Sequence, residues 1–442
     1  MPAERGTTTF RARIAAVAAA LAWLALASPA PAAAKASFAE LLANLKSPNA
    51  GTRQEAAIEL GKSRRREAVP PLSAMLRDPE PKVRMAAVRA LRELRDLSAT
   101  SGLCTSVQDG DAGIREEAIG ALVELYAERE RTSPVERFLD LFSDEFDRAS
   151  VPLYTTVDPQ VVSALAGALR DEDKSIRREA ALALGILDGR AAVRDLVAAL
   201  QDPDAGVRGA AVTAIGKVGT AAEGKALIPL IADESAEVRH RALQALGVLR
   251  VREAGPALRE LYDANRTREL STRVLASLSR IADPSQGDLF RELLQDADTE
   301  KKRLAIEGLA RIADTSLLPA FKKDYQREGN EQLKLAYSFG LARLGDRAFI
   351  DSIVLALPSR TLGTQARRYL LEMGKDILPE LYPYLNDPEA EIRATLCDIV
   401  AQIGDADAVA RLAPLVSDPN AKVADRANRA VELLRRSNPP PR

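Results

Sequence analysis

The side chains that most often carry out catalysis or hold metals are scarce in this chain. Its 442 residues include one histidine, His240, and two cysteines, Cys104 and Cys397. A zinc site of nitrogen and sulfur ligands needs about four such side chains, and a nucleophilic cysteine needs a base beside it. Phosphate-binding loops and dinucleotide fingerprints are also missing from the sequence. We therefore expect no metal, no cofactor, an exposed imidazole at His240, and two buried thiols too far apart for a disulfide.

Carboxylates are abundant but carry little information about function. The 63 Asp and Glu residues could supply the acid pair of a glycoside hydrolase, yet they are spread over the whole chain. They balance 62 Lys and Arg, and the net charge of −1 gives no general reason to expect nucleic acid or an anionic membrane as partner. Only 4% of the residues are aromatic, which favours helices packed through small side chains over a β-rich core.

One short phrase recurs along the chain and reveals the elements that position these side chains. Its clearest copy runs from Asp202 to Arg208, and successive copies are about 31 residues apart, with one doubled step of 62 between Arg115 and Arg177. Counted from the basic position, which we call the anchor, the twelve copies fall at Arg53, Arg84, Arg115, Arg177, Arg208, Arg239, Ser271, Lys302, Lys334, Gly363, Arg393 and Ala424. Such a period is typical of a repeat protein.

The conserved positions within each copy predict helices. Seven residues after the anchor all twelve copies are aliphatic, and three residues after it nine are Ala. These positions lie on one face of a helix. Six residues before the anchor, eight copies carry Asp, which can cap the following helix, and a second amphipathic segment lies upstream. The sequence therefore predicts an all-α solenoid of about twelve helical hairpins over residues 35–436, stacked on one continuous core.

The repeats resemble the HEAT-like repeats first described in phycobilisome lyases. The resemblance rests on the Asp-Pro turn, the Val-Arg pair and the stretches Ala183-Leu184-Gly185 and Ala245-Leu246-Gly247, and it covers about Phe38 to Arg436. It implies that each Arg meets an Asp of its own or the adjacent turn in a structural ladder, because a catalytic pair need not recur at every period. The ladder residues are Arg84, Arg115, Arg177, Arg208, Arg239, Arg393, Asp78, Asp202, Asp233 and Asp387. The paired His-Glu motifs of HEAT-repeat hydroxylases do not occur in this sequence.

The first 34 residues have the pattern of a secretory signal peptide. Arg5, Arg11 and Arg13 precede an apolar run from residue 14 to 27, and small residues end at Ala34. The run is shorter than the roughly 20 residues that a membrane-spanning helix needs. We expect cleavage near Ala34, with Ala36 as the neighbouring choice, a periplasmic or secreted protein, and no membrane span in the processed chain. Residues 437–442, rich in Pro, are expected to be a disordered tail.

The doubled step contains residues 128–159, which depart from the pattern. Phe138, Phe142 and Phe146 share one helix face, and Tyr154 follows after Pro152. One interpretation is a degenerate repeat whose aromatic rings fill the core. The other is a protruding segment whose aromatic rings anchor a partner.

Repeats seven to ten are richer in basic residues. Residues 301–375 contain 14 Lys or Arg against 8 Asp or Glu. Lys322, Lys323, Arg367 and Arg368 lie near aromatic residues, namely Phe321, Tyr325, Tyr337 and Tyr369. A solvated charged face is the first interpretation. An acidic protein or a polyanionic glycan as partner is the second, and nucleic acid is the least favoured.

Five residues after the anchor, the side chain varies from repeat to repeat, as at Arg89, Thr213, Glu307 and Phe339. A constant core beside a varied ridge favours an extended binding surface. The sequence thus indicates an exported, monomeric scaffold that binds another protein and has no catalytic activity. The alternatives are a lyase-like enzyme or enzyme subunit acting on a protein-bound cofactor, and a glycan-binding surface protein.

Overall fold

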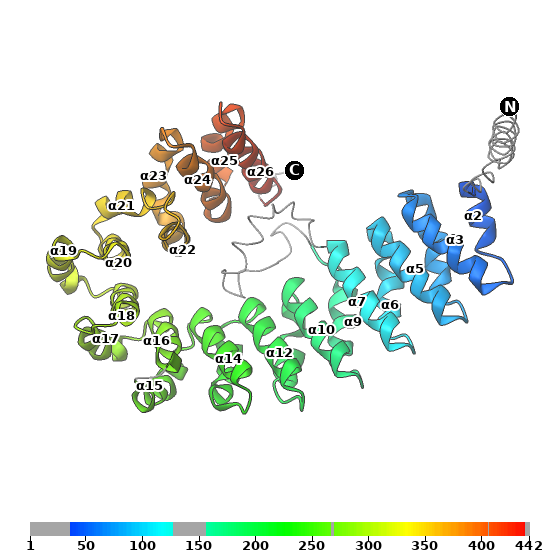
Figure 1. The fold of residues 1–442 in the computed structure, drawn as a ribbon, viewed down its shortest axis with the longest axis horizontal. Helices are drawn as coiled ribbons and strands as arrows, with labels where there is room; N and C mark the ends of the chain where they lie inside the picture. The colour runs from blue at the N-terminus through cyan, green and yellow to red at the C-terminus, as the bar shows by residue number, and fades with distance from the viewer. Residues whose placement is uncertain (1–35, 127–155, 267–268, 405, 438–442) are drawn as a thin grey trace, which may run out of the picture.

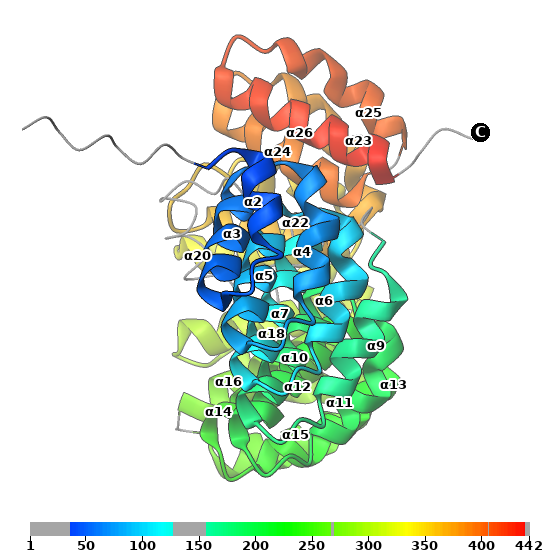
Figure 2. The same ribbon diagram turned by 90° about the vertical axis from the view of Figure 1, so that its right-hand side faces the viewer.

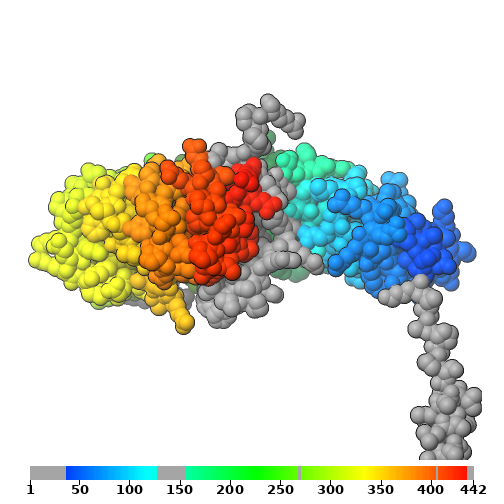
Figure 3. Space-filling view, turned by 90° about the horizontal axis from the view of Figure 1, so that it is seen from above, coloured from blue at the N-terminus to red at the C-terminus, as the bar shows by residue number. Residues whose placement is uncertain are grey.

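The computed structural model describes residues 36–126, 156–266, 269–404 and 406–437. These residues form helical hairpins stacked side by side into an open arc (Figure 1). Figure 2 views the arc from its N-terminal side, with the last repeats above the first, and Figure 3 shows the two arms from above. Within the described ranges there is no β-strand. The predicted all-α solenoid of about twelve hairpins is therefore confirmed.

The first helices of the hairpins form the outer row of the arc, and the second helices form the inner row (Figure 1). The outer row consists of α2 (Phe38–Asn44), α4 (Val69–Met75), α6 (Thr100–Ser106), α9 (Pro159–Ala168), α11 (Val193–Ala199), α13 (Ala221–Gly224), α15 (Gly255–Ala264), α17 (Gly287–Leu293), α19 (Leu318–Arg327), α21 (Ile350–Val354), α23 (Leu378–Leu381) and α25 (Ala406–Leu412). The inner row consists of α3 (Ala50–Lys62), α5 (Pro81–Leu94), α7 (Ala112–Tyr126), α10 (Lys174–Ile186), α12 (Ala205–Val218), α14 (Ala236–Val248), α16 (Glu269–Ile281), α18 (Thr299–Ile312), α20 (Glu331–Arg343), α22 (Gly363–Met373), α24 (Ala390–Ile403) and α26 (Ala421–Ser437).

The start of α12 is set by two polar residues rather than one. Asp204 is the residue that caps α12, since its Oδ1 accepts from the backbone N–H groups of Gly206 and Val207. Asp202, which the sequence suggested as the cap, instead accepts from the N–H of Asp204 at 2.9 Å. The conserved Asp therefore shapes the turn before the helix, and both of its oxygens also accept from Arg177 of the preceding repeat. This corrects the predicted capping role.

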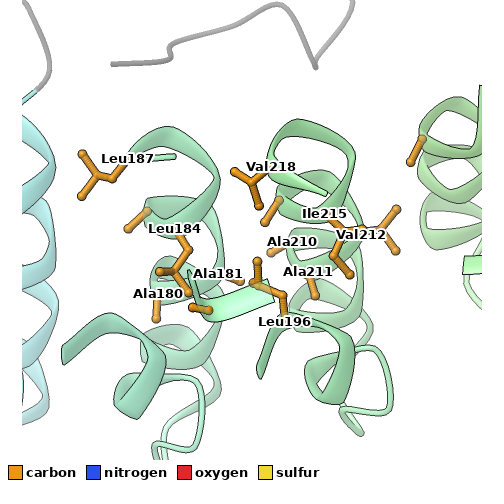
Figure 4. Close-up of a cluster of buried hydrophobic side chains, with 14 of the residues drawn as sticks. Ala180, Ala181, Leu184, Leu187, Leu196, Ala210, Ala211, Val212, Ile215 and Val218 are labelled. Atoms are coloured by element: carbon orange, nitrogen blue, oxygen red, sulfur yellow. The ribbon is translucent and has the colours of Figure 1, made fainter. Parts of the chain in front are cut away.

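The conserved apolar positions form the core between the two rows. Leu184 and Ile215, seven residues after their anchors, are fully buried, as are Ala180 and Ala211 at three residues after them. Figure 4 shows these side chains meeting Leu196 of the outer helix α11. Alanine brings neighbouring helices close together, and the larger aliphatic side chains fill the remaining space.

The core consists of two clusters of buried residues that adjoin at α18 and α20, and the partly buried Phe349 packs against both. The first extends from Leu45 to Leu344 and the second from Ala310 to Leu434. Phe339 belongs to the second cluster, whereas Leu341 on the same helix belongs to the first. Helix α20 therefore contributes to both clusters. In the ranges that the structure describes, no helix is long and apolar enough to cross a membrane.

Candidate binding surface on the inner helices

Each regular rung of the ladder joins two consecutive repeats through one arginine. Nε and Nη2 of Arg208 donate to the two carboxylate oxygens of Asp233, each at 2.9 Å. Nη1 donates to the carbonyl oxygens of Asp202 and Pro203 at 2.9 and 3.2 Å, in the turn of its own repeat. The side chains of Arg208 and Asp233 are only 9% and 6% exposed. A planar guanidinium can make both contacts at once because its donors form a rigid fork.

The same two-sided contact recurs in both halves of the array. It joins Arg53 to Asp78, Arg84 to Asp109, Arg115 to Asp171, Arg177 to Asp202, and Arg393 to Asp418. Arg393 donates to the carbonyl of Asp387, and Arg239 to that of Asp233, each in its own turn. Where the anchor is Lys302, its Nζ lies 3.3 Å from Glu328 of the next turn. The carboxylate thus belongs to the adjacent repeat and the carbonyl to the same repeat.

The ladder carboxylates are acids held in their charged form. The hydrogen bond from Arg208 lowers the pKa of Asp233 and outweighs the opposing effect of burial. The fork of Arg53 lowers the pKa of Asp78 in the same way. Groups that are ionised and bound to a guanidinium are poor proton donors and poor metal ligands, so their arrangement serves to connect repeats rather than to do chemistry.

The array continues directly across the doubled step. Nε of Arg115 lies 2.7 Å from Oδ2 of Asp171, and Nη2 donates to Oδ1 at 2.8 Å. Helix α7 packs against α10, and α6 packs against α9. Among the described residues, the third and fourth hairpins of the stack are therefore direct neighbours. Most of residues 128–159 lie outside the described residues, so both interpretations of that segment stay predictions. The candidate anchors Phe138, Phe142, Phe146 and Tyr154 lie outside the described residues.

The four basic residues singled out in the sequence are not on one helix or one row. Lys322 and Lys323 are on α19 of the outer row, where Lys322 forms an ion pair with Asp346 at 2.6 Å. Arg367 and Arg368 are half-buried on α22 of the inner row. The structure therefore divides the predicted basic patch into two parts.

The aromatic residues near these basic side chains belong to the core. Phe321 and Tyr337 are buried and meet edge to face with ring centroids 5.3 Å apart. A Cβ atom at Gly340 would lie 2.7 Å from the Phe321 ring, so glycine makes room for it. Tyr325 packs edge to face on Phe349. Buried rings cannot stack on bases, which removes the main argument for nucleic acid in this region.

A buried polar cluster that the sequence did not predict lies where α18, α20 and α22 come together in the inner row. Its centre is Glu307, which is 3% exposed. Oε1 of Glu307 accepts from the hydroxyl of Tyr369 at 2.5 Å and from Arg303, and Oε2 accepts from Arg311 at 3.2 Å. Burial and the neighbouring Glu307 raise the pKa of Tyr369 well above its ordinary value, so the hydroxyl remains a donor.

Two stacked rings support this cluster. Phe339 and Tyr369 lie nearly parallel, with centroids 4.2 Å apart, and both are buried. The guanidinium groups of Arg311 and Arg343 lie over Phe339 at 5.5 and 5.8 Å from its centroid. The position five residues after the anchor, which was interpreted as a solvent-exposed ridge, is therefore buried at Glu307 and Phe339. The one feature of the sequence that could have indicated this cluster is the unusual pair of residue types, Glu307 and Phe339, at that position.

The remaining candidates for chemistry are the two cysteines and the single histidine. Cys104 and Cys397 are buried and free, and burial raises their pKa values to about 11 and about 12. His240 is half-buried rather than exposed as predicted. Among the described residues, no three His, Cys, Asp or Glu side chains are arranged to hold a metal ion.

The fold and the repeated ladder define a HEAT-repeat α-solenoid. The family model of HEAT repeats matches residues 38–123, 162–235 and 224–310, which together are more than half of the chain, and the chain therefore belongs to this family. Beyond residue 310 the structure continues the same hairpins from α19 to α26.

Two solved structures are similar to this chain. One is an engineered protein that is 19% identical, with 90% of this chain and 98% of that chain covered and a TM-score of 0.37. The other is the protein YibA of Escherichia coli, also 19% identical, with 63% and 93% covered and a TM-score of 0.41. No curated protein matches the chain.

Proposed function

We propose that this chain is an exported scaffold that binds another protein on its inner helix row and has no catalytic activity of its own. HEAT repeats are generally protein-interaction scaffolds. The observation that carries the proposal is that some positions of the repeat hold the array together while others present varied side chains to solvent. Six Arg anchors and their Asp partners are occupied with one another. By contrast, inner-row side chains such as Arg89, which is exposed beside Glu117, and Gln244 differ in chemistry and reach solvent.

Export is the second part of the proposal, and the first 34 residues support it. Their basic start, short apolar run and small residues near Ala34 are those of a signal peptide. Mass spectrometry of the N-terminus of the chain recovered from a periplasmic fraction tests this. A new N-terminus at residue 35 or 37 supports export, and an intact Met1 in a cytoplasmic fraction contradicts it.

The binding surface can be tested with matched variants of the full chain. The double variant Arg89→Glu and Gln244→Glu changes the inner row, and Arg194→Glu with Gln201→Glu makes equal substitutions at exposed positions outside it. We expect a protein captured from exported proteins by the unmodified chain to be lost with the inner variant and kept with the outer one. Equal binding by both would place the surface elsewhere. A chromophore or small molecule in place of a protein would support the lyase-like alternative, and size-exclusion chromatography should show a monomer.

A further inference from the structure

Three arginines of the inner row meet around a single carboxylate. They are Arg250, just after α14, Arg311 on α18 and Arg343 on α20, and we call them the arginine cluster. Arg311 donates from Nε and Nη2 to the two oxygens of Glu372 at 2.8 and 3.0 Å. Arg250 donates to the same carboxylate at 3.4 Å, although 122 residues separate it from Glu372. The curvature of the array therefore gathers positive charge from distant repeats at one point.

Arg343 is the member of the cluster without a matched anion. Its Nε atom is buried and has no hydrogen-bond partner among the described residues. Its guanidinium lies over the Phe339 ring, which holds it in place. Burial lowers the pKa of Arg343. The nearby charge of Glu372 raises it, whereas the charges of Arg311 and Arg250 lower it further. A guanidinium stays charged even so, and a buried donor without a partner is costly.

The nearby carboxylates already accept hydrogen bonds from other side chains. Glu372 is bound by Arg311 and Arg250, as described above. Glu307 accepts from Tyr369, Arg303, Arg311 and the amide of Gln365. One more anion is needed to match the third guanidinium of the cluster. The approach is open at Arg250, whose side chain is 57% exposed.

We propose that the arginine cluster binds a carboxylate of an acidic segment in the partner protein, and that Arg343 is its main contact. A carboxylate fits the fork of one guanidinium with two parallel hydrogen bonds. The charge of the surrounding repeats agrees with an acidic partner, since residues 301–375 carry six more basic than acidic side chains. This inference rests on the proposed function, because it specifies the chemistry that the scaffold recognises.

The test uses the purified full chain and a fluorescein-labelled peptide of eight glutamates, with an eight-glutamine peptide as its control. Fluorescence anisotropy should show binding of the glutamate peptide that weakens as salt rises. Arg343→Met keeps the apolar stem over Phe339 and removes the charge, so we expect roughly tenfold weaker binding. Arg343→Lys should retain part of the affinity because it keeps the charge and loses the fork. Arg250→Gln should also weaken binding, and the outer-row variant Arg194→Met should leave it unchanged.

Melting temperatures separate a binding role from a structural one. Because Arg343→Met removes a half-buried charge whose Nε atom has no partner, its Tm should equal or exceed that of the unmodified chain. A lower Tm with unchanged peptide affinity would overturn the proposal and make Arg343 a structural residue. Binding of polyphosphate without binding of the glutamate peptide would also overturn it. These outcomes would leave the scaffold proposal standing, because that proposal depends on the capture experiment with Arg89 and Gln244.

Discussion

Arg115 binds Asp171 across a separation of 56 residues, whereas Arg84 binds Asp109 across 25. Nε lies 2.7 Å from Oδ2 in both contacts, but only Nε of Arg84 forms a hydrogen bond there, and Arg115 binds through Nη2. The additional chain between Arg115 and Asp171 equals one repeat period, yet α7 packs directly against α10. The ladder contacts therefore join hairpins that are neighbours in space, whatever their separation in the sequence.

This contact predicts that residues 133–152 can be removed without loss of the fold. Because α7 already packs on α10, we expect the deletion variant to keep its helical circular dichroism and to melt within a few degrees of the full chain. Deleting the equally long segment 205–224, which contains α12, should disrupt the array. Unfolding of the first variant would show that the segment belongs to the core. Loss of partner capture by a folded variant would support its role as an anchor.

The second prediction concerns a single rung of the ladder. Arg208→Ala leaves the buried carboxylate of Asp233 without its fork, which should cost about 2 kcal/mol and lower Tm by a few degrees. The Tm of Arg208→Lys should lie between that of Arg208→Ala and that of the unmodified chain, since lysine keeps the charge but cannot make both contacts. The exposed outer-row variant Arg194→Ala is the control for thermal melting. Loss of partner binding with unchanged stability would count against a structural ladder.

The ladder should also make the protein sensitive to acid. Hydrogen bonds from arginine lower the pKa values of Asp78, Asp233 and Asp418 below the ordinary 3.8. Their contribution is therefore complete above that value and is lost as pH falls through the lower folded values. We expect Tm to change little from about pH 7 to pH 5 and to fall steeply below about pH 4. Asp233→Asn should show a shallower fall, and a flat profile down to about pH 2.5 would contradict the argument.

The fourth prediction concerns the two thiols. Because burial raises the pKa of Cys104 to about 11 and that of Cys397 to about 12, both remain protonated at about pH 8 and are shielded from reagents. Dithionitrobenzoate should react slowly with the folded chain and rapidly with both thiols in guanidinium chloride. Cys104→Ala should halve the signal from the unfolded chain. Fast reaction of the folded chain would show that at least one thiol is accessible.

The sequence by itself determined the hairpin and the positions of the regular rungs. These depend on residues within one or two periods, such as Asp202, Arg208 and Asp233, and a local pattern repeated twelve times leaves few alternatives. It also marked residues 128–159 as irregular. It did not determine whether that segment occupies a layer of the stack, because the pairing of Arg115 with Asp171 depends on what packs against α7.

Only the tertiary structure decided which side chains meet at the inner surface of the later repeats. Glu307 meets Tyr369 across 62 residues and Arg250 meets Glu372 across 122. Such contacts arise from small rotations between neighbouring hairpins that add up along the array, and no single repeat encodes their sum. The same curvature buried Phe339 and left Arg343 without a matched anion. The repeat period of the sequence therefore predicted the ladder, whereas the arginine cluster forms only when the repeats stack into the folded arc.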